Sequence, residues 1–149
     1  MPRGQMTREL PTSLLMFIAS RAAADRIFRT LRDGGFDDVT LAQSRLMMGI
    51  DTDGTRLSVL ADRAQIAKQT ATALVDKLER AGYVERVPDP SDGRARLVRM
   101  TPRAEAALPI ARAEEDRIET EWRAHLGAER MDQLRQALTA LREITDPYR

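Results

Sequence analysis

The fold is decided by residues 57–101, which read LSVLADRAQIAKQTATALVDKLERAGYVERVPDPSDGRARLVRMT. Their apolar spacing predicts a short helix over 58–64, with Ser58 as its N-cap, and a longer helix over 68–81. Gly82 comes directly afterwards, where many helices end on a glycine. Two helices joined by a turn of three residues are typical of a helix-turn-helix unit.

A β-hairpin is predicted directly after these helices. Residues 83–87 and 95–100 have strand character, and the loop 88–94 between them is rich in proline, aspartate and glycine. Thr101-Pro102 then has the composition of a helix start, because proline at the first helical position loses no hydrogen bond. We expect a long helix from there to about Leu126, a break at Gly127 and a last helix. That last helix carries apolar residues three and four apart: Met131, Leu134, Leu138 and Leu141.

The chain before residue 57 predicts two further helices. The first runs from Pro11 to Asp33 and has an apolar stripe that includes Leu14 and Ile18. The second follows Thr40, which forms a capping box with Gln43. We expect three of its apolar side chains to point inward: Leu41, Leu46 and Met47. The predicted fold class is therefore mostly α with a small β-hairpin.

Composition excludes several classes of protein. A length of 149 residues is typical of one cooperative unit. The chain has no cysteine and one histidine, His125, so it cannot form disulfides or thiolate metal sites, and a histidine-rich metal site is not favoured. It has no glycine-rich phosphate loop and no nucleophile–base pair, so we expect neither an enzyme nor a cofactor nor a metal.

The sequence also argues against a membrane protein. No stretch approaches the roughly 18 apolar residues of a membrane span, and the N-terminus lacks the apolar region of a secretory signal. We therefore expect a cytoplasmic protein that does not contact a membrane.

Charge is distributed unevenly along the chain, although the formal net charge is only +1. Residues 61–100 carry eight basic and six acidic side chains, whereas five acidic residues crowd into 114–121. If the protein binds nucleic acid, we expect contact through the middle of the chain.

A short helix, a tight turn, a longer helix and a hairpin with arginines near its tip predict a winged helix-turn-helix. Side chains near the start of the second helix can reach base edges in the major groove of DNA. The candidates on this recognition helix are Lys68, Gln69, Thr70, Thr72, Ala73 and Lys77. In the hairpin, or wing, Arg94 and Arg96 are candidates for phosphate or minor-groove contact. Asp92 is expected to shape the turn and Gly93 to permit it.

Simpler explanations exist for some of these residues. Thr70 and Thr72 could belong to the surface of an ordinary helix, and the hairpin with its arginines is what favours DNA contact. Arg80 and Arg86 are better explained as solvated or as paired with Glu79 and Glu85, because exposed ion pairs at such spacings are common.

Residues 36–145 resemble the multiple-antibiotic-resistance regulator (MarR) family. The resemblance is carried by LVDKLERAGYVER, by the wing DPSDGRA with Asp92 and Arg94, and by the exit Met100-Thr101-Pro102. It implies a DNA-binding region over 36–101 and a helical dimerisation region over 1–35 and 102–149. It also implies a homodimer that acts on a pseudo-palindromic operator in double-stranded DNA, more often as a repressor than as an activator.

Three residues depart from the family pattern. Ala67 stands where a serine or threonine often caps the recognition helix, and Ala73 stands where an arginine is frequent. Gln65 replaces a glycine that is common in the turn, which is tolerable if its backbone stays right-handed. Because of these departures, base preference cannot be copied from relatives.

The resemblance implies a small aromatic or phenolic effector, and Phe17, Met47 and Met48 are candidates to line its pocket. Core packing explains these three residues better. The alternative function is a winged-helix module that docks other proteins and does not bind DNA.

Overall fold

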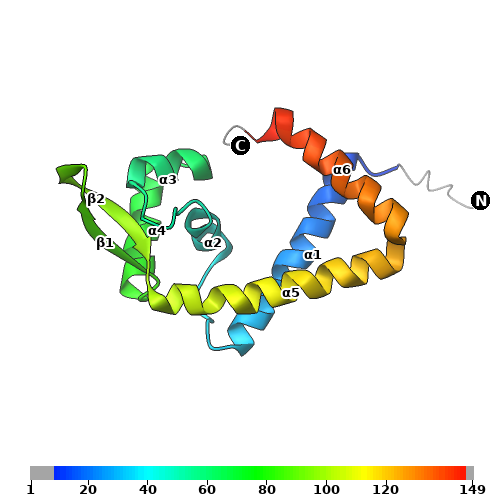
Figure 1. The fold of residues 1–149 in the computed structure, drawn as a ribbon, viewed down its shortest axis with the longest axis horizontal. Helices are drawn as coiled ribbons and strands as arrows, with labels where there is room; N and C mark the ends of the chain where they lie inside the picture. Colours follow the sequence, from blue (N-terminus) through cyan, green and yellow to red (C-terminus); the bar gives the residue numbers. More distant parts are fainter. Residues whose placement is uncertain (1–8, 147–149) are drawn as a thin grey trace, which may run out of the picture.

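The computed structural model describes residues 9–146, and within that range it contains six helices and one hairpin (Figure 1). The elements are α1 (Thr12–Asp33), α2 (Leu41–Met47), α3 (Leu57–Ala64), α4 (Lys68–Arg80), β1 (Val84–Asp89), β2 (Asp92–Met100), α5 (Pro102–Leu126) and α6 (Ala128–Thr145). The mostly helical fold class is confirmed. The outer parts of the predicted dimerisation region, residues 1–8 and 147–149, lie outside the described residues.

Helix α5 joins two parts of the molecule (Figure 1). One end carries a lobe made of α2, α3, α4 and the hairpin, which we call the winged lobe. Helix α1 crosses α5 near its middle, and α6 folds back from the far end of α5. No helix within residues 9–146 is both long and apolar enough to cross a membrane.

Local capping interactions start two helices where the sequence predicts. The Gln43 amide donates to Thr40 Oγ1 at 3.2 Å, and the Thr40 amide donates to Gln43 Oε1 at 2.9 Å, so the capping box is present. Thr101 Oγ1 accepts from the Ala104 amide, with Pro102 in the first turn of α5. The breaks at Gly82 and Gly127 are also confirmed, and both glycines have positive φ.

The start of α3 differs from the prediction. Arg56, not Ser58, occupies the N-cap, and Ser58 lies in the first turn. The reason is a contact far along the chain: Thr55 and Val98 exchange two backbone hydrogen bonds of 2.9 Å, which hold the chain extended until Arg56. A third short strand segment therefore flanks the hairpin at this point.

Gln65 has a left-handed backbone, with φ 54° and ψ 44°, so the right-handed backbone that would make this residue tolerable in place of glycine is not found. The Ile66 amide donates to the Ala61 carbonyl and the Gln65 amide to the Asp62 carbonyl, which is the hydrogen-bond pattern of a Schellman motif. Helices α1 and α4 end with the same pattern but place Gly35 and Gly82 at the left-handed position.

The hairpin strands are longer than predicted. Only Pro90 and Ser91 separate β1 from β2, whereas the sequence indicates a loop over 88–94. The strands are antiparallel, Val84 pairs with Met100, and the register is irregular between Pro88 and Asp89. The turn is tighter than its composition predicts, and Asp89 beside it accepts hydrogen bonds from Ser91 and Arg56.

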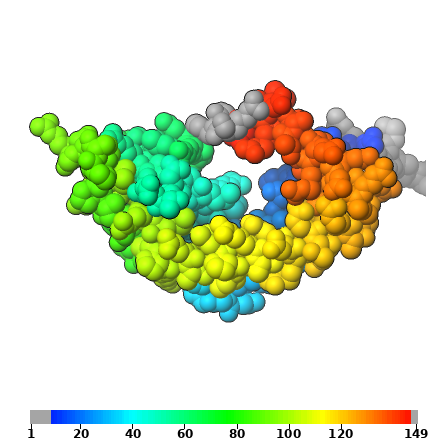
Figure 2. All heavy atoms as spheres, viewed as in Figure 1, coloured from blue at the N-terminus to red at the C-terminus, as the bar shows by residue number. Residues whose placement is uncertain are grey.

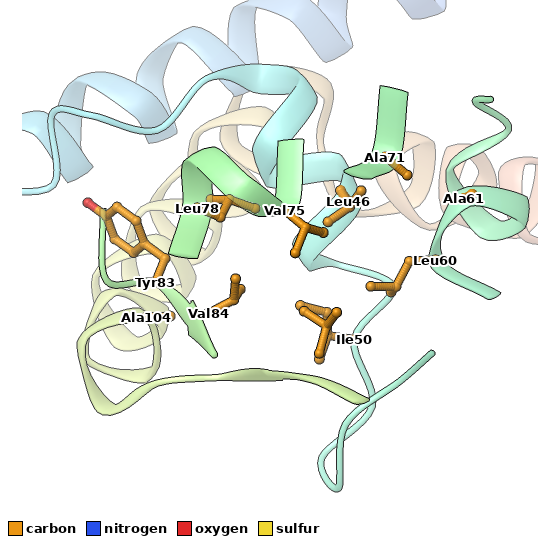
Figure 3. Close-up of a cluster of buried hydrophobic side chains, with 11 residues drawn as sticks. Leu46, Ile50, Leu60, Ala61, Ala71, Val75, Leu78, Tyr83, Val84 and Ala104 are labelled. Atoms are coloured by element: carbon orange, nitrogen blue, oxygen red, sulfur yellow. The ribbon is translucent and has the colours of Figure 1, made fainter. Parts of the chain in front are cut away.

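The main hydrophobic core lies in the winged lobe (Figure 3). Its centre consists of fully buried side chains from α2, α3, α4, the α4–β1 connection and the hairpin: Leu46, Leu60, Ala71, Val75, Leu78, Tyr83, Val84 and Val98. Leu46 and the half-buried Met47 point inward as expected, but Leu41 is 45% exposed and the polar Gln43 is buried instead. The capping box holds Gln43 at that position.

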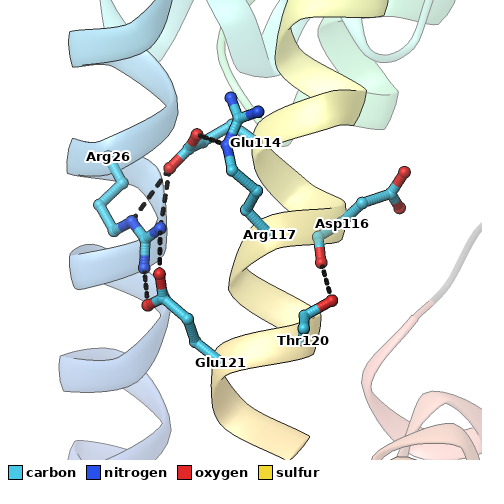
Figure 4. Close-up of polar contacts among 6 residues, drawn as sticks. All are labelled: Arg26, Glu114, Asp116, Arg117, Thr120 and Glu121. Carbon is cyan, nitrogen blue, oxygen red and sulfur yellow. Dashed lines mark hydrogen bonds and ion pairs between the residues drawn. The ribbon is translucent and has the colours of Figure 1, made fainter.

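The other helices are packed far less completely. Helix α1 has no buried residue, and the stripe residues Leu14 and Ile18 are exposed. Between α1 and α5, Arg26 forms ion pairs with Glu114 and Glu121, and Arg117 also binds Glu114 (Figure 4). Hydrogen bonds from Arg117 and Arg26 hold the pKa of Glu114 below its ordinary value.

Candidate nucleic-acid interface

Helix α4 is amphipathic, with one face in the core and the other open to solvent. Ala71, Val75 and Leu78 are fully buried and fix the rotation of the helix. The predicted recognition residues lie on the remaining surface: Lys68, Gln69, Thr70, Ala73 and Lys77 are exposed and Thr72 is half-buried. The core contacts of α4 therefore bring these six residues together on one outward surface.

The beginning of α4 differs from a well-capped helix. Ala67 occupies the N-cap, with φ −62° and ψ 145°, and no side chain accepts a hydrogen bond there. Thr72 Oγ1 donates to the Lys68 carbonyl at 2.9 Å, so its proton is already used within the helix. In this geometry Thr72 offers DNA an acceptor and a methyl group, but not a donor.

The wing carries two unpaired guanidinium groups. Arg94 and Arg96 are exposed on β2, and neither side chain makes a hydrogen bond or ion pair with any part of the chain that the structure describes. The hairpin projects from the end of the winged lobe, so it forms an extremity of the molecule (Figure 2). Two free cations on a projecting hairpin are suited to phosphate oxygens or to a narrow minor groove.

The two residues assigned to wing architecture have different outcomes. Asp92 Oδ1 accepts from the Arg94 amide at 3.0 Å and so shapes the start of β2. Gly93 lies inside β2 without a positive φ, and a Cβ added there would meet no atom within 4 Å. Its predicted role in permitting a tight turn is therefore wrong, because the turn itself lies at residues 90–91.

Sequence reasoning missed the polar cluster at the wing tip. Arg56 Nε donates to Asp89 Oδ2 at 2.9 Å, and the Ser91 amide and hydroxyl donate to Asp89 Oδ1 at 2.9 and 2.7 Å. The hydrogen bonds from Ser91, with that from Arg56, lower the pKa of Asp89. The spacing Asp-Pro-Ser is a local signal for such a turn, but nothing local predicts Arg56 as a partner.

The other arginines near this surface are mostly engaged. Arg86 pairs with Glu79, as expected, and with Asp76 rather than Glu85. Glu85 instead pairs across the hairpin with Arg99. This leaves Arg94 and Arg96 as the unpaired arginines of the hairpin.

A polar contact joins the winged lobe to the α1–α2 connection and to α5. The buried Tyr83 hydroxyl donates to Asp38, and the Arg103 guanidinium lies 4.3 Å from the centre of the Tyr83 ring. Burial, and then the hydrogen bond to Asp38, raises the pKa of Tyr83 to about 12. The same hydrogen bond lowers the pKa of Asp38.

The three effector-pocket candidates do not meet in one pocket of the protomer. Phe17 is 55% exposed on α1 and Met48 is 83% exposed just after α2, whereas Met47 packs against the winged core. The core-packing explanation is correct for Met47 and wrong for the other two. Among the described residues there is also no group of three or more side chains that could hold a metal ion.

Helix α4 is amphipathic, follows α3 after a tight turn and is followed by a basic hairpin. This arrangement defines a winged helix-turn-helix. Comparison with known sequences and structures shows which proteins this chain is similar to. Residues 37–95 match the sequence profile described as MarR family. No curated protein matches the chain significantly.

Solved structures extend the likeness over most of the chain. The structure described as MarR is 26% identical, with a TM-score of 0.69, covering 90% of this chain and 96% of the other. The transcriptional regulator Tm0710 from Thermotoga maritima is 25% identical, with a TM-score of 0.62, covering 93% and 96%. S. aureus MepR, solved in complex with DNA, is 21% identical, with a TM-score of 0.68, covering 89% and 97%.

Over residues 37–95 in sequence, and over most of the chain in structure, the protein is therefore similar to the MarR family of winged-helix transcriptional regulators. The members of that family are transcriptional regulators and not enzymes, in agreement with the expectation from the sequence.

Proposed function

We propose that this protein is a homodimeric, ligand-responsive repressor that binds a pseudo-palindromic operator in the cytoplasm. The observation that carries the DNA contact is the surface shared by α4 and the wing. Polar side chains line the outward side of α4, and the unpaired Arg94 and Arg96 extend from the wing. The related fold of MepR, described in a DNA complex, supports the same use of this surface.

The dimer is supported by apolar surface outside the winged lobe. Leu14, Leu15, Phe17 and Ile18 on α1 and Leu134, Leu138, Leu141 and Ile144 on α6 are exposed in the protomer. Apolar residues gathered on two helices at the same end of the molecule are typical of a protein interface (Figure 1). A second copy covering them would place two α4 helices on one duplex, about one helical turn apart.

A ligand could control DNA binding by changing the spacing of the two α4 helices in the proposed dimer. A small aromatic or phenolic effector that fits only one spacing of the two recognition helices would shift the population toward that spacing. Phe17 and Met48, which are exposed in the protomer, remain candidates for contact with it, whereas Met47 packs against the winged core. A panel of such compounds, added to the protein–DNA complex, should contain members that weaken binding at least severalfold. If no compound changes the affinity, the effector part of the proposal fails.

The first test is a mobility shift with the purified protein and the DNA upstream of its own gene, at two salt concentrations. Multi-angle light scattering on the same sample should give twice the mass of one chain. Binding should weaken steeply with salt, because each phosphate contact releases a counterion. Arg94→Ala should reduce affinity by about tenfold at low salt and flatten the salt dependence.

The control in this experiment is Arg130→Ala. Arg130 is exposed near the start of α6, far from the winged lobe. Its replacement by alanine removes the same charge as Arg94→Ala. Its affinity for DNA should equal that of the wild type. No shift with this fragment or with random genomic fragments would instead favour a docking module that binds other proteins.

A further inference from the structure

The wing tip contains a carboxylate that is buried although it lies near the end of a projecting hairpin. Asp89 is 7% exposed, and both of its oxygens are occupied. Oδ1 accepts from the Ser91 amide and hydroxyl at 2.9 and 2.7 Å. Oδ2 lies 2.9 Å from Arg56 Nε and 2.8 Å from Arg56 Nη2. An exposed surface ion pair rarely has this many partners.

Arg56 links Asp89 to a second carboxylate at the start of β2, that of Asp92. Its Nη2 also lies 3.7 Å from Asp92 Oδ2, while Asp92 Oδ1 accepts from the Arg94 amide. The backbone of Arg56 is held in place, because this residue is the N-cap of α3 and follows the Thr55–Val98 backbone pair. A continuous chain of contacts therefore runs from the start of α3 to the backbone of Arg94.

The sign of the charges makes this cluster unusual for a DNA-facing surface. Two carboxylates near phosphate would weaken binding by Coulomb repulsion if they acted only through their charge. Arg56 lies between them, because its Nη2 is 2.8 Å from Asp89 Oδ2 and 3.7 Å from Asp92 Oδ2. The position of these carboxylates is understandable when their role is to hold the geometry of the wing and not to contact DNA.

We infer that Arg56, Asp89 and Asp92 form a clamp that orders the wing tip and thereby positions Arg94 for DNA. This inference rests on the proposed function, because it concerns how the wing meets a duplex. Arg56 and Asp89 are positioning residues that act through the backbone of Arg94. Loss of the clamp lets the tip sample many conformations, so that DNA binding must order it again.

The decisive variant is Asp89→Asn, which keeps the size of the side chain and removes its charge. The matched control is Glu85→Gln, which raises the net charge equally and breaks the Glu85–Arg99 pair on the same hairpin. Electrostatics alone predicts that both variants bind DNA slightly more tightly. The clamp predicts that Asp89→Asn binds the upstream fragment about fivefold more weakly while Glu85→Gln does not. Equal or tighter binding by Asp89→Asn would overturn the inference.

Two further variants keep the test valid if Asp89→Asn folds poorly by circular dichroism. Arg56→Lys retains the charge but cannot contact Asp89 through two guanidinium nitrogens, so it should also bind DNA more weakly. Ser91→Ala removes one donor to Asp89 without any change of charge and should have a smaller effect in the same direction. In addition, Arg94→Ala should reduce affinity less in the Asp89→Asn background than in the wild type, because the two residues act together.

Limited trypsin digestion without DNA separates this inference from the proposed function. Trypsin cleaves after arginine, so cleavage after Arg94 and Arg96 reports the order of the wing directly. We expect it to be faster in Asp89→Asn than in wild type and Glu85→Gln. If wild-type protein binds no duplex, the proposed function fails whatever the digestion shows. If the wild type binds DNA but wing cleavage and affinity are unchanged in Asp89→Asn, the clamp alone is wrong.

Discussion

Gln65 adopts a backbone conformation that glycine adopts at less cost. A left-handed conformation costs an L-residue with a side chain roughly 1–2 kcal/mol. Replacement by glycine removes this strain but adds freedom to the unfolded chain. We therefore expect Gln65→Gly to raise the free energy of unfolding by about 0.5–1 kcal/mol in chemical denaturation. Ala73→Gly, on the exposed right-handed part of α4, should lower it by about 1 kcal/mol. A less stable Gln65→Gly would contradict this account of the turn.

Ionisation of Tyr83 should make the stability of the fold depend on pH in the alkaline range. Its pKa is raised to about 12, first by burial and then by the hydrogen bond to Asp38. The folded state therefore favours the protonated phenol, and the resulting stability is complete below pH 10 and is lost as the pH rises from 10 through 12. Absorbance titration at alkaline pH should show Tyr83 ionising near 12, and Tyr83→Phe should abolish that step.

Asp38→Asn separates the two causes of this shift. It should lower the pKa of Tyr83 only part of the way, because burial has the larger effect. An ordinary pKa for Tyr83 in the wild type would mean that its ring is not buried in solution.

At the scale of elements, α2 and α4 begin in opposite ways. Helix α2 has a complete capping box, whereas α4 begins at Ala67 without a side-chain acceptor. Ala67 already has the extended backbone of an N-cap, so Ala67→Ser should raise the free energy of unfolding by about 1 kcal/mol. Thr40→Ala should lower it by about the same amount. Thermal denaturation of both variants checks the pair, and equal melting temperatures would count against the helix boundaries.

At the scale of the whole molecule, the unburied apolar residues of α1 and α6 predict assembly. Leu15→Glu combined with Ile144→Glu should convert the proposed dimer into a monomer in sedimentation velocity, since it places charge in an apolar interface. Ile144 is 84% exposed in the protomer, so the fold of one chain does not depend on it.

Leu41→Glu is the control for this prediction. Leu41 has comparable exposure to Leu15 but lies on α2 in the winged lobe. The control variant should keep the mass of the wild type. A double variant that also keeps that mass would place the interface elsewhere.

Much of the fold could be predicted because its signals are local. The capping pair Thr40–Gln43, the Thr101-Pro102 helix start and the glycines at 82 and 127 each act within a few residues, and all are found as expected. The order of helix, turn, helix and hairpin could likewise be predicted, because the spacing of apolar residues distinguishes a helix from a strand. These features also led to the recognition helix and to the basic wing.

The parts that could not be predicted depend on partners far apart in the sequence. Arg56 meets Asp89 across 33 residues, and Tyr83 meets Asp38 across 45. The left-handed Gln65 and the N-cap at Arg56 follow from how α3 packs against α4 and β2. Local preference is weak compared with such packing, so the sequence pattern alone misplaced these positions.

Local sequence signals are enough to specify which elements this protein has, their order and the side of α4 that faces outward. Each of these depends on neighbours within one or two helical turns. The tertiary structure decided which apolar stripes are buried, where the wing turns and which arginines are unpaired. Burial and ion pairing are properties of surfaces that meet only after the chain has folded, so Leu14 and Leu46 could not be separated by their periodicity alone.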